Sequence, residues 1–256
     1  MATFKSVLKI SRTVMPELGV KEGQLNQSLR KSCVIIVTYN RIPNIGQLNK
    51  ALSAGTLDGI IIVDNSGKPS LINGIKSQYL SEHLTKYYLI ENNENLGISK
   101  ALNKGFRKAM EEGFYFIYLL DDDATISENF FEIERETFER LAGEGKNVGA
   151  ICPVVSNNPD QLDDITKKYT ISEVRYAITS GLLITTDTIN KVGGYDERFF
   201  LEWADIVLTQ AITSNGLRIF RINQILVVQD FLSVTHIQRL PSLNIRVVLS
   251  VVYNGM

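Results

Sequence analysis

Three consecutive aspartates, Asp121, Asp122 and Asp123, follow directly after the apolar run at residues 114–120. Side chains alternate along an extended chain, so we expect Asp121 and Asp123 to point to one side and Asp122 to the other. Two carboxylates on one side of a strand end repel each other unless a divalent cation lies beside them. The pattern therefore favours a site for Mg²⁺ or Mn²⁺ that substrate phosphates complete. The alternative is an acidic turn that caps a helix beginning near Ser127.

Two further acids, Glu202 and Asp205, flank the lone tryptophan, Trp203. A helix beginning at this point would place the two carboxylates three residues apart on one face. One of them is suited to act as a general base, because a carboxylate near an apolar wall can have the raised pKa that proton abstraction requires. The alternative is an acidic first turn that the helix dipole stabilises, and the spacing does not decide between the two.

Small polar residues occupy the other positions where a ligand is expected. Asp64 ends an apolar run, where it could bind a ribose or a base or could belong to an ordinary turn. Asn95 and Gly97 precede a helical pattern, with Asn103 further along it. A helix N-terminus can bind a phosphate, but by itself this pattern favours the alternative, in which Asn95 is a plain helix cap.

Several classes of protein are excluded. The 27 basic and 28 acidic residues of the 256-residue chain give no reason to expect nucleic acid as a partner. The motifs of P-loop proteins, kinases and dinucleotide-binding proteins are absent, and His83 and His236 are solitary. Cys33 and Cys152 lie in apolar runs, which indicates buried free thiols and a reducing compartment. With no apolar stretch of about 18 residues and no secretory signal, we expect a cytoplasmic protein.

The elements that must position these residues alternate along the first half of the chain. The patterns predict strands at 33–39, 59–63, 87–90 and 114–120, and helices at 44–54, 71–84 and 95–112. Such alternation indicates βαβ units and a mostly parallel sheet, whose ligands bind beyond the carboxyl ends of the strands.

The second half is less regular. Its patterns predict strands at 148–155, 176–185, 217–222 and 225–228, with a break at Ser180-Gly181. They also predict a helix at 202–214 and a final apolar segment.

Taken in order, six motifs resemble those of family 2 glycosyltransferases, especially the bacterial rhamnosyltransferases and galactofuranosyltransferases of surface polysaccharide (O-antigen) synthesis. The resemblance covers about residues 33–230. The motifs are VIIVTYNR (34–41), IIVDNS (61–66), NLG with ALNKG (95–105), LLDDD (119–123), SG (180–181) and VGGYDERFF (192–200).

The resemblance implies an α/β fold of the GT-A type, with a mostly parallel central sheet flanked by helices. In it, a Rossmann-like nucleotide-sugar half (32–125) is fused to an acceptor-binding half (126–240). Residues 1–31 would be an extension in front of this domain, and residues 241–256 a C-terminal apolar segment.

The resemblance also assigns roles to single residues. Asp205 falls where the family places its general base, and Asp121 and Asp123 match its metal-binding motif for Mn²⁺ or Mg²⁺. Acceptor contacts are expected from Ser180, Gly181, Glu202 and Trp203. Donor contacts are expected from Thr38, Asn40, Asp64, Asn95, Gly97, Asn103, Asp121 and Asp122.

These roles imply an inverting, metal-dependent transfer from a UDP- or dTDP-linked sugar to a hydroxyl of a lipid-linked or oligosaccharide acceptor. Peripheral contact with the inner membrane face and a homo-oligomer are further expectations from the family. Val207 and Gln229 stand where many members of the family have an acid and a metal-binding histidine. They keep open the alternative of a non-catalytic nucleotide-sugar-binding protein.

Overall fold

The computed structural model describes residues 30–43, 46–79, 86–163 and 168–229. Nearly all of the predicted extension 1–31, and the whole C-terminal segment 241–256, lie outside the described residues. The same holds for His83 and His236.

The first half forms a parallel sheet in the spatial order β3-β2-β1-β4. Its elements alternate as predicted: β1 (Lys31–Thr38), α3 (Gly46–Ala54), β2 (Gly59–Asp64), α4 (Pro69–Tyr79), β3 (Tyr87–Glu91), α5 (Ile98–Glu111) and β4 (Phe114–Asp121).

The second half continues the same sheet, because β8 pairs with β4 in antiparallel orientation. The full order over the described residues is β3-β2-β1-β4-β8-β6-β9-β5, with β7 paired to β9. The elements are β5 (Thr125–Ile126), α6 (Phe130–Gly143), β6 (Val148–Ser156), a 3₁₀ turn (Pro159–Gln161), β7 (Ile171–Val174), β8 (Leu182–Thr185), α7 (Thr186–Val192), α8 (Ala204–Ser214) and β9 (Arg218–Val228).

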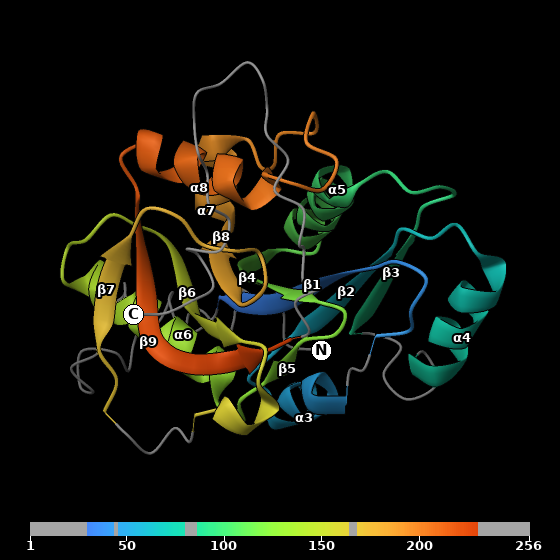
Figure 1. The fold of residues 1–256 in the computed structure, drawn as a ribbon, viewed down its shortest axis with the longest axis horizontal. Coiled ribbons are helices and arrows are strands. Elements are labelled where there is room, and N and C mark those ends of the chain that lie inside the picture. Colours follow the sequence, from blue (N-terminus) through green and yellow to red (C-terminus); the bar gives the residue numbers. More distant parts are fainter. Residues whose placement is uncertain (1–29, 44–45, 80–85, 164–167, 230–256) are drawn as a thin grey trace, which may run out of the picture.

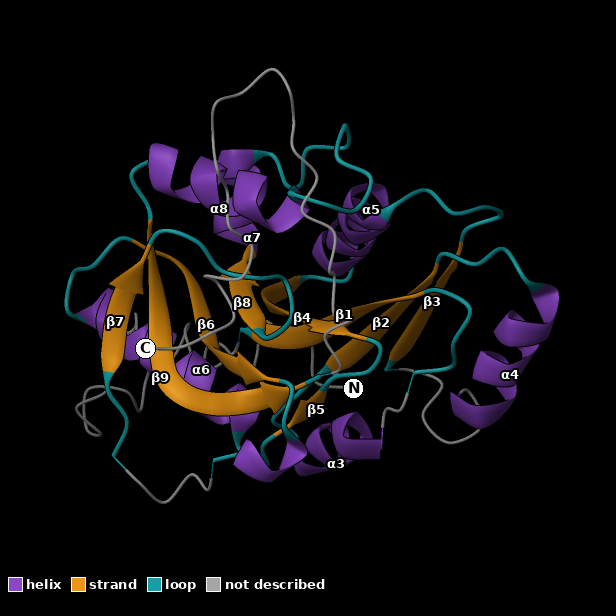
Figure 2. Cartoon of the chain, in the orientation of Figure 1, coloured by secondary structure: helices purple, strands orange, loops and turns teal. Residues whose placement is uncertain are grey.

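Helices cover both faces of the sheet, which gives three layers (Figure 1). Val34 and Ile36 of β1 pack on the face covered by α3, α4 and α6. Cys33 and Ile35 point to the other face, toward α5, α7 and α8. Burial on both sides explains the continuous apolar runs of the central strands. Figure 2 colours the helices purple and the strands orange, and it shows β9 as a long curved strand.

Several predicted boundaries in the second half are wrong. The strand predicted at 176–185 is limited to Leu182–Thr185, while β7 and α7 were not predicted. The two strands predicted at 217–222 and 225–228 form one strand, β9, whose pairing with β6 is irregular near Val154. The helix predicted at 202–214 begins only at Ala204.

The cysteines match their prediction, since Cys33 and Cys152 are buried free thiols. Burial raises the pKa of both. Within the part of the chain that the structure describes, no helix has the length and apolar character needed to cross a bilayer.

Glu134, on the buried face of α6, is an unexpected carboxyl group in the core. Its side chain is fully buried, and neither carboxylate oxygen has a hydrogen-bond partner. Burial raises the pKa of Glu134 well above its ordinary value of 4.5. The folded chain therefore binds this proton more tightly than the unfolded chain, and stability falls as the pH rises above about 4.5.

We expect Glu134→Met to raise the free energy of unfolding at pH 7 by about 2 kcal/mol, because it removes an unpaired buried polar group of similar size. Denaturant unfolding would measure the change. Glu136→Met, at an exposed position of the same helix, is the matched control and should change it by less than about 0.5 kcal/mol. A destabilised Glu134→Met variant would show that the carboxylate is satisfied in solution.

Candidate active site

The predicted donor-binding residues at the strand ends meet at one edge of the sheet. β1 lies between β2 and β4 and is parallel to both. In this register Thr38 is opposite Asp64, and Val37 is opposite Asp121. The carboxyl ends of three strands thus bring these polar residues together, as ligand sites of parallel sheets require.

The acidic turn, here the name for Asp121, Asp122 and Asp123, begins where β4 ends. Asp122 accepts hydrogen bonds from Thr38 Oγ1 (2.9 Å) and from the Tyr39 backbone N–H (3.4 Å). Arg41 Nη1 lies 3.5 Å from carboxylate oxygens of both Asp122 and Asp123. Asp122 and Asp123 thus share the Arg41 guanidinium. The predicted placement of Asp122 and Asp123 on opposite sides is therefore wrong, because the extended strand ends at Asp121 and the chain turns. Sequence reasoning gave Arg41 no role, since its partners are about 80 residues away in the chain.

Asp121, the first residue of this turn, has a raised pKa. Burial raises the pKa of Asp121 from its ordinary 3.8 to about 6, and repulsion from Asp123, Asp122 and Asp205 adds to the shift. A hydrogen bond from the Gln229 side chain opposes the shift. The ionised carboxylate is thus disfavoured unless positive charge is supplied.

The residues present fit a hard divalent cation. Asp121 and Asp123 offer carboxylate oxygens, which such a cation prefers. The Gln229 side chain is hydrogen-bonded to Asp121, and its buried amide oxygen has no hydrogen-bond partner. No group of three or more His, Cys, Asp or Glu within the described ranges could hold a metal by itself. Such a cation would take one or two carboxylates here and the rest of its ligands from substrate phosphates and water.

Asp205 lies in the first turn of α8. Its Oδ1 accepts a hydrogen bond from the Ile206 N–H at 2.8 Å, and burial raises its pKa above the ordinary 3.8. Its charge contributes to the raised pKa of Asp121, so the two carboxylates are close enough to interact. Trp203 caps the helix with a φ of 69°. The predicted pairing of Glu202 with Asp205 on one helical face is wrong, because Glu202 is exposed and precedes the helix.

A buried network of amides surrounds the end of β2. One oxygen of the fully buried Asp64 accepts from the Ser66 N–H and hydroxyl, while Oδ2 has no partner. Asn65 accepts from Asn92 Nδ2 (3.1 Å) and donates to Asn95 Oδ1 (2.7 Å). The orphaned oxygen of Asp64 is an acceptor that a ligand N–H or hydroxyl could satisfy. Asn65 has no predicted role, although it follows Asp64 at the strand end.

The predicted acceptor residues Ser180 and Gly181 lie beside β4. Ser180 Oγ accepts from the Asp121 N–H at 3.3 Å, and the Gly181 N–H donates to the Leu119 carbonyl at 2.8 Å. Gly181 has a φ of +83°, and a Cβ there would lie 2.8 Å from Pro153. These two residues therefore adjoin the acidic turn.

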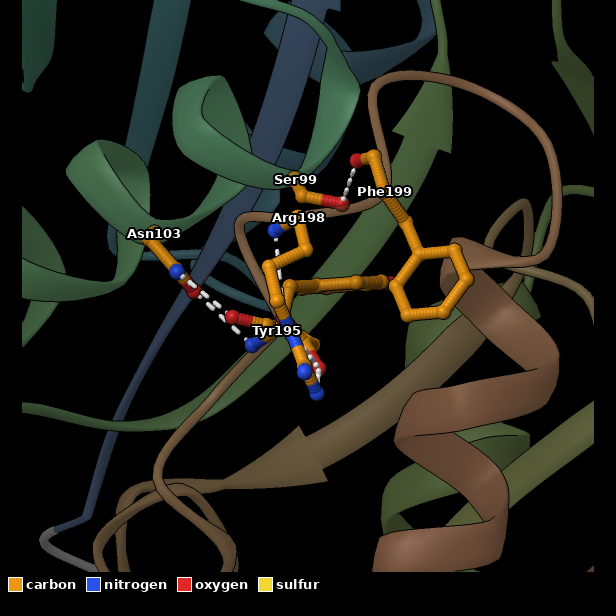
Figure 3. Close-up of polar contacts among 6 residues, drawn as sticks. Ser99, Asn103, Tyr195, Arg198 and Phe199 are labelled. Carbon is orange, nitrogen blue, oxygen red and sulfur yellow. Dashed lines mark hydrogen bonds and ion pairs between the residues drawn. The ribbon is translucent and has the colours of Figure 1, made fainter.

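Two predicted donor residues, Gly97 and Asn103, contact a loop that precedes α8. The contacts of Asn103 are drawn in Figure 3. Asn103 is bonded to Tyr195 and Glu197, and Gly97 adjoins Phe200. Asn40 is an exposed residue with a φ of 57° at the end of β1. Their roles toward a donor stay predictions.

Gly97 offers a test of this contact. It has φ 80° and ψ 165°, a conformation almost restricted to glycine, and a Cβ would lie 2.6 Å from the Phe200 carbonyl oxygen. Gly113, after the other end of α5, has a φ of +74° and open space around it. We expect Gly113→Ala to cost about 1 kcal/mol in unfolding free energy and Gly97→Ala about 3 kcal/mol. Equal costs in urea unfolding would contradict the close approach.

A pH-dependent stability follows from Asp121. Its folded pKa of about 6 exceeds its ordinary 3.8, so the folded chain binds the proton more tightly between these values. Stability therefore falls as the pH rises through this window. Without cation or nucleotide, we expect the free energy of unfolding of Asp121→Asn to be about 2 kcal/mol higher than that of the wild type at pH 8. At pH 4 the two values should be nearly equal. Denaturant titrations at both pH values measure this, and a difference independent of pH would contradict it.

Comparisons with known proteins agree with this picture. Residues 33–144 match the family model described as glycosyl transferase family 2. Over 184 residues the chain is 26% identical to the dTDP-rhamnosyl transferase RfbF of Shigella flexneri, covering 67% of this chain and 59% of that protein. The chain thus spans less than two thirds of that relative. The predicted resemblance to family 2 glycosyltransferases and to rhamnosyltransferases is confirmed.

Solved structures confirm the predicted GT-A fold. GalNAc-T7 with UDP, GalNAc and Mn²⁺ superposes with a TM-score of 0.65 at 12% identity, over 79% of this chain and 44% of that one. S. aureus TarS 1-349 superposes with a TM-score of 0.56 at 16% identity, over 78% of this chain and 60% of that one. The mannosyltransferase PcManGT from Pyrobaculum calidifontis, in complex with GDP-Man and Mn²⁺, gives 0.51 at 19% identity, over 79% and 58%.

Proposed function

We propose that this chain, whose residues 33–144 carry a family 2 glycosyltransferase domain, transfers a sugar from a nucleotide-sugar donor to an acceptor hydroxyl. The observation that carries the proposal is the meeting of Asp64, Asp121, Asp123 and Asp205 around one edge of the sheet. The dTDP-rhamnosyl transferase relative makes dTDP-rhamnose the first donor to test, and a UDP-sugar the second. A lipid-linked or oligosaccharide acceptor follows from the family resemblance.

The donor's nucleoside would bind at the ends of β1 and β2. The unpartnered Oδ2 of Asp64 would accept a hydrogen bond from the base or the ribose, which removes the cost of its burial. Thr38 donates to Asp122 at 2.9 Å and so fixes the turn that would border the diphosphate. Asn40 and Asn95 would contact the donor at the same edge.

Asp205 would act as the general base. Its raised pKa moves it toward the range in which a carboxylate can take a proton from an acceptor hydroxyl. The oxygen freed of its proton then attacks the anomeric carbon as the diphosphate leaves from the opposite face. A single displacement of this kind inverts the anomeric configuration. It needs no covalent enzyme intermediate, so no activated nucleophile is required.

Asp121 and Asp123, with Gln229 beside them, would hold the Mn²⁺ or Mg²⁺ ion. When bound, the cation stabilises the negative charge of the departing diphosphate. Arg41 shares that charge compensation from its place between Asp122 and Asp123. Ser180, Gly181 and Trp203 would border the acceptor.

The test is donor turnover by the purified chain. It is incubated with dTDP-rhamnose or a UDP-sugar, Mn²⁺, and a lipid-linked or oligosaccharide acceptor, and the released nucleotide diphosphate and the glycosylated product are measured. Formation of product of inverted configuration supports the proposal. Binding of the donor without transfer or hydrolysis would overturn it in favour of the non-catalytic nucleotide-sugar-binding alternative.

A further inference from the structure

The loop of residues 194–203, here named the base loop, connects the end of α7 to the start of α8 and leads directly into Asp205. Figure 3 shows its residues Tyr195 and Phe199 beside Asn103 and Ser99 of α5. Its exposed side chains, Phe200 and Leu201, give it little core of its own. Its position must therefore be set largely by the elements that it contacts.

Asn103 of α5 uses its whole side-chain amide on the base loop. Its Oδ1 accepts from the Tyr195 N–H at 2.9 Å, and its Nδ2 donates to the Tyr195 carbonyl at 2.9 Å and to Glu197 at 3.1 Å. The residue is buried. The two bonds to the Tyr195 backbone pair groups that would otherwise be left unsatisfied in a buried contact.

The first turn of α5 provides a second attachment. Ser99 Oγ donates to the Phe199 carbonyl at 2.5 Å, and the Ile98 N–H donates to the Phe200 carbonyl at 2.7 Å. Gly97 has no side chain to keep Phe200 away. Asn95 Oδ1 accepts from the Gly97 N–H and from Asn65, so these contacts continue toward the end of β2.

Tyr195 fixes the beginning of the base loop from the other side. Its ring stacks on Phe106 of α5 at a centroid distance of 5.7 Å. Its hydroxyl lies 2.9 Å from Thr179 Oγ1, directly before the predicted acceptor residue Ser180. The loop is thus attached both to α5 and to the chain beside β4.

The last residue of the base loop is strained. Within the described ranges, Asn40 and Trp203 are the non-glycine residues with positive φ, at 57° and 69°. For a bulky residue such as tryptophan this conformation is costly and persists only where the surroundings impose it. The attachments of residues 195–200 hold the chain that leads into Trp203.

We propose that Asn103 and Ser99 are positioning residues that hold the base loop on α5 and thereby keep Asp205 half-buried near Asp121. This inference rests on the proposed function, in which Asp205 is the base. It gives Asn103 a role through the loop in place of the donor contact that the sequence predicted. Neither residue touches the reacting atoms in this role.

Trp203 provides a readout that does not depend on activity. It is the single tryptophan of the chain and lies two residues before Asp205. Its fluorescence and its quenching by acrylamide therefore report on the end of the base loop. The variants are Asn103→Ala and Ser99→Ala, with Lys100→Ala, at an exposed position of the same helix turn, as the matched control.

In both variants we expect faster acrylamide quenching of Trp203 than in the wild type and in Lys100→Ala. We also expect kcat to fall, by up to about 10²-fold for Asn103→Ala, with little change in the KM for the donor. The ascending limb of the pH profile of kcat should move to lower pH, because a more exposed Asp205 loses the burial that raises its pKa.

Ser99→Ala removes a single hydroxyl, so it keeps the test valid if Asn103→Ala does not fold. Wild-type quenching in the folded variants would overturn the proposal. Faster quenching of Trp203 with an unchanged kcat and an unchanged pH profile would also overturn the proposal. If the wild-type chain itself transfers no sugar, the proposed function fails. If the wild type is active and the variants behave like it, only the positioning role fails.

Discussion

Replacing Asp205 by asparagine is expected to lower kcat for sugar transfer by about 10³-fold or more, because the amide cannot take the proton of the acceptor hydroxyl. The affinity for the nucleotide should stay within about twofold, since the proposed partner of Asp205 is the acceptor hydroxyl and not the nucleotide. Steady-state kinetics and nucleotide titration on the same preparation measure both quantities.

The matched control for this variant is Glu136→Gln, which removes one carboxylate from an exposed position of α6. It should keep wild-type kcat. In the wild type, kcat should rise with pH through a pKa above 3.8, as the raised pKa of Asp205 requires. An Asp205→Asn protein with near wild-type kcat would show that another group takes the proton.

The second large effect is expected from Asp123→Asn, which removes one carboxylate of the proposed cation site. Nucleotide binding in the presence of Mn²⁺ should weaken by about 10²-fold, or about 2.7 kcal/mol, because the diphosphate loses the ion that neutralises it. Without Mn²⁺ the two proteins should bind the nucleotide with similar, weak affinity. Calorimetric titration with and without Mn²⁺ measures these values.

Asp187→Asn is the matched control here. Asp187 is exposed on α7, bonds the hydroxyl of Tyr115 and lies outside the acidic turn. It should keep the full effect of Mn²⁺. If Asp123→Asn also kept the full effect of Mn²⁺, the acidic turn would have no part in cation binding. Arg41 would then be the main positive charge available to the diphosphate from this turn.

The first half of the fold could be predicted because its local patterns are strong. β1, β2 and β4 are buried on both faces, so their residues form unbroken apolar runs that end at a polar residue. The second half depends on contacts distant in sequence. β7 is only partly buried at the sheet margin, and β9 passes an irregular pairing near Val154 that interrupts the apolar pattern. Local periodicity could not resolve either strand.

The candidate site could be predicted at the level of residues but not of contacts. Strand ends in a parallel sheet meet at one edge, which is why Thr38, Asp64 and Asp121 lie together as expected. The ion pairs of Arg41 and the attachment of Asn103 to the base loop join segments about 80 to 90 residues apart. Such pairs carry no local signal in one sequence.

Glu202 and Trp203 show why helix starts are hard to place. The acidic and aromatic residues fit a first helical turn, which led to the predicted face shared by Glu202 and Asp205. The positive φ of Trp203 delays the helix to Ala204 and leaves Glu202 exposed. Tertiary contacts of the base loop override the local preference here.

Calorimetric titration of the wild-type chain with dTDP and with UDP, each with and without Mn²⁺, tests the central claim most directly. The claim is that the carboxyl edge of this sheet is a cation-dependent nucleotide-sugar site. We predict that one of the two nucleotides binds in a one-to-one complex that requires Mn²⁺. Failure of both nucleotides to bind, with and without the cation, would contradict it.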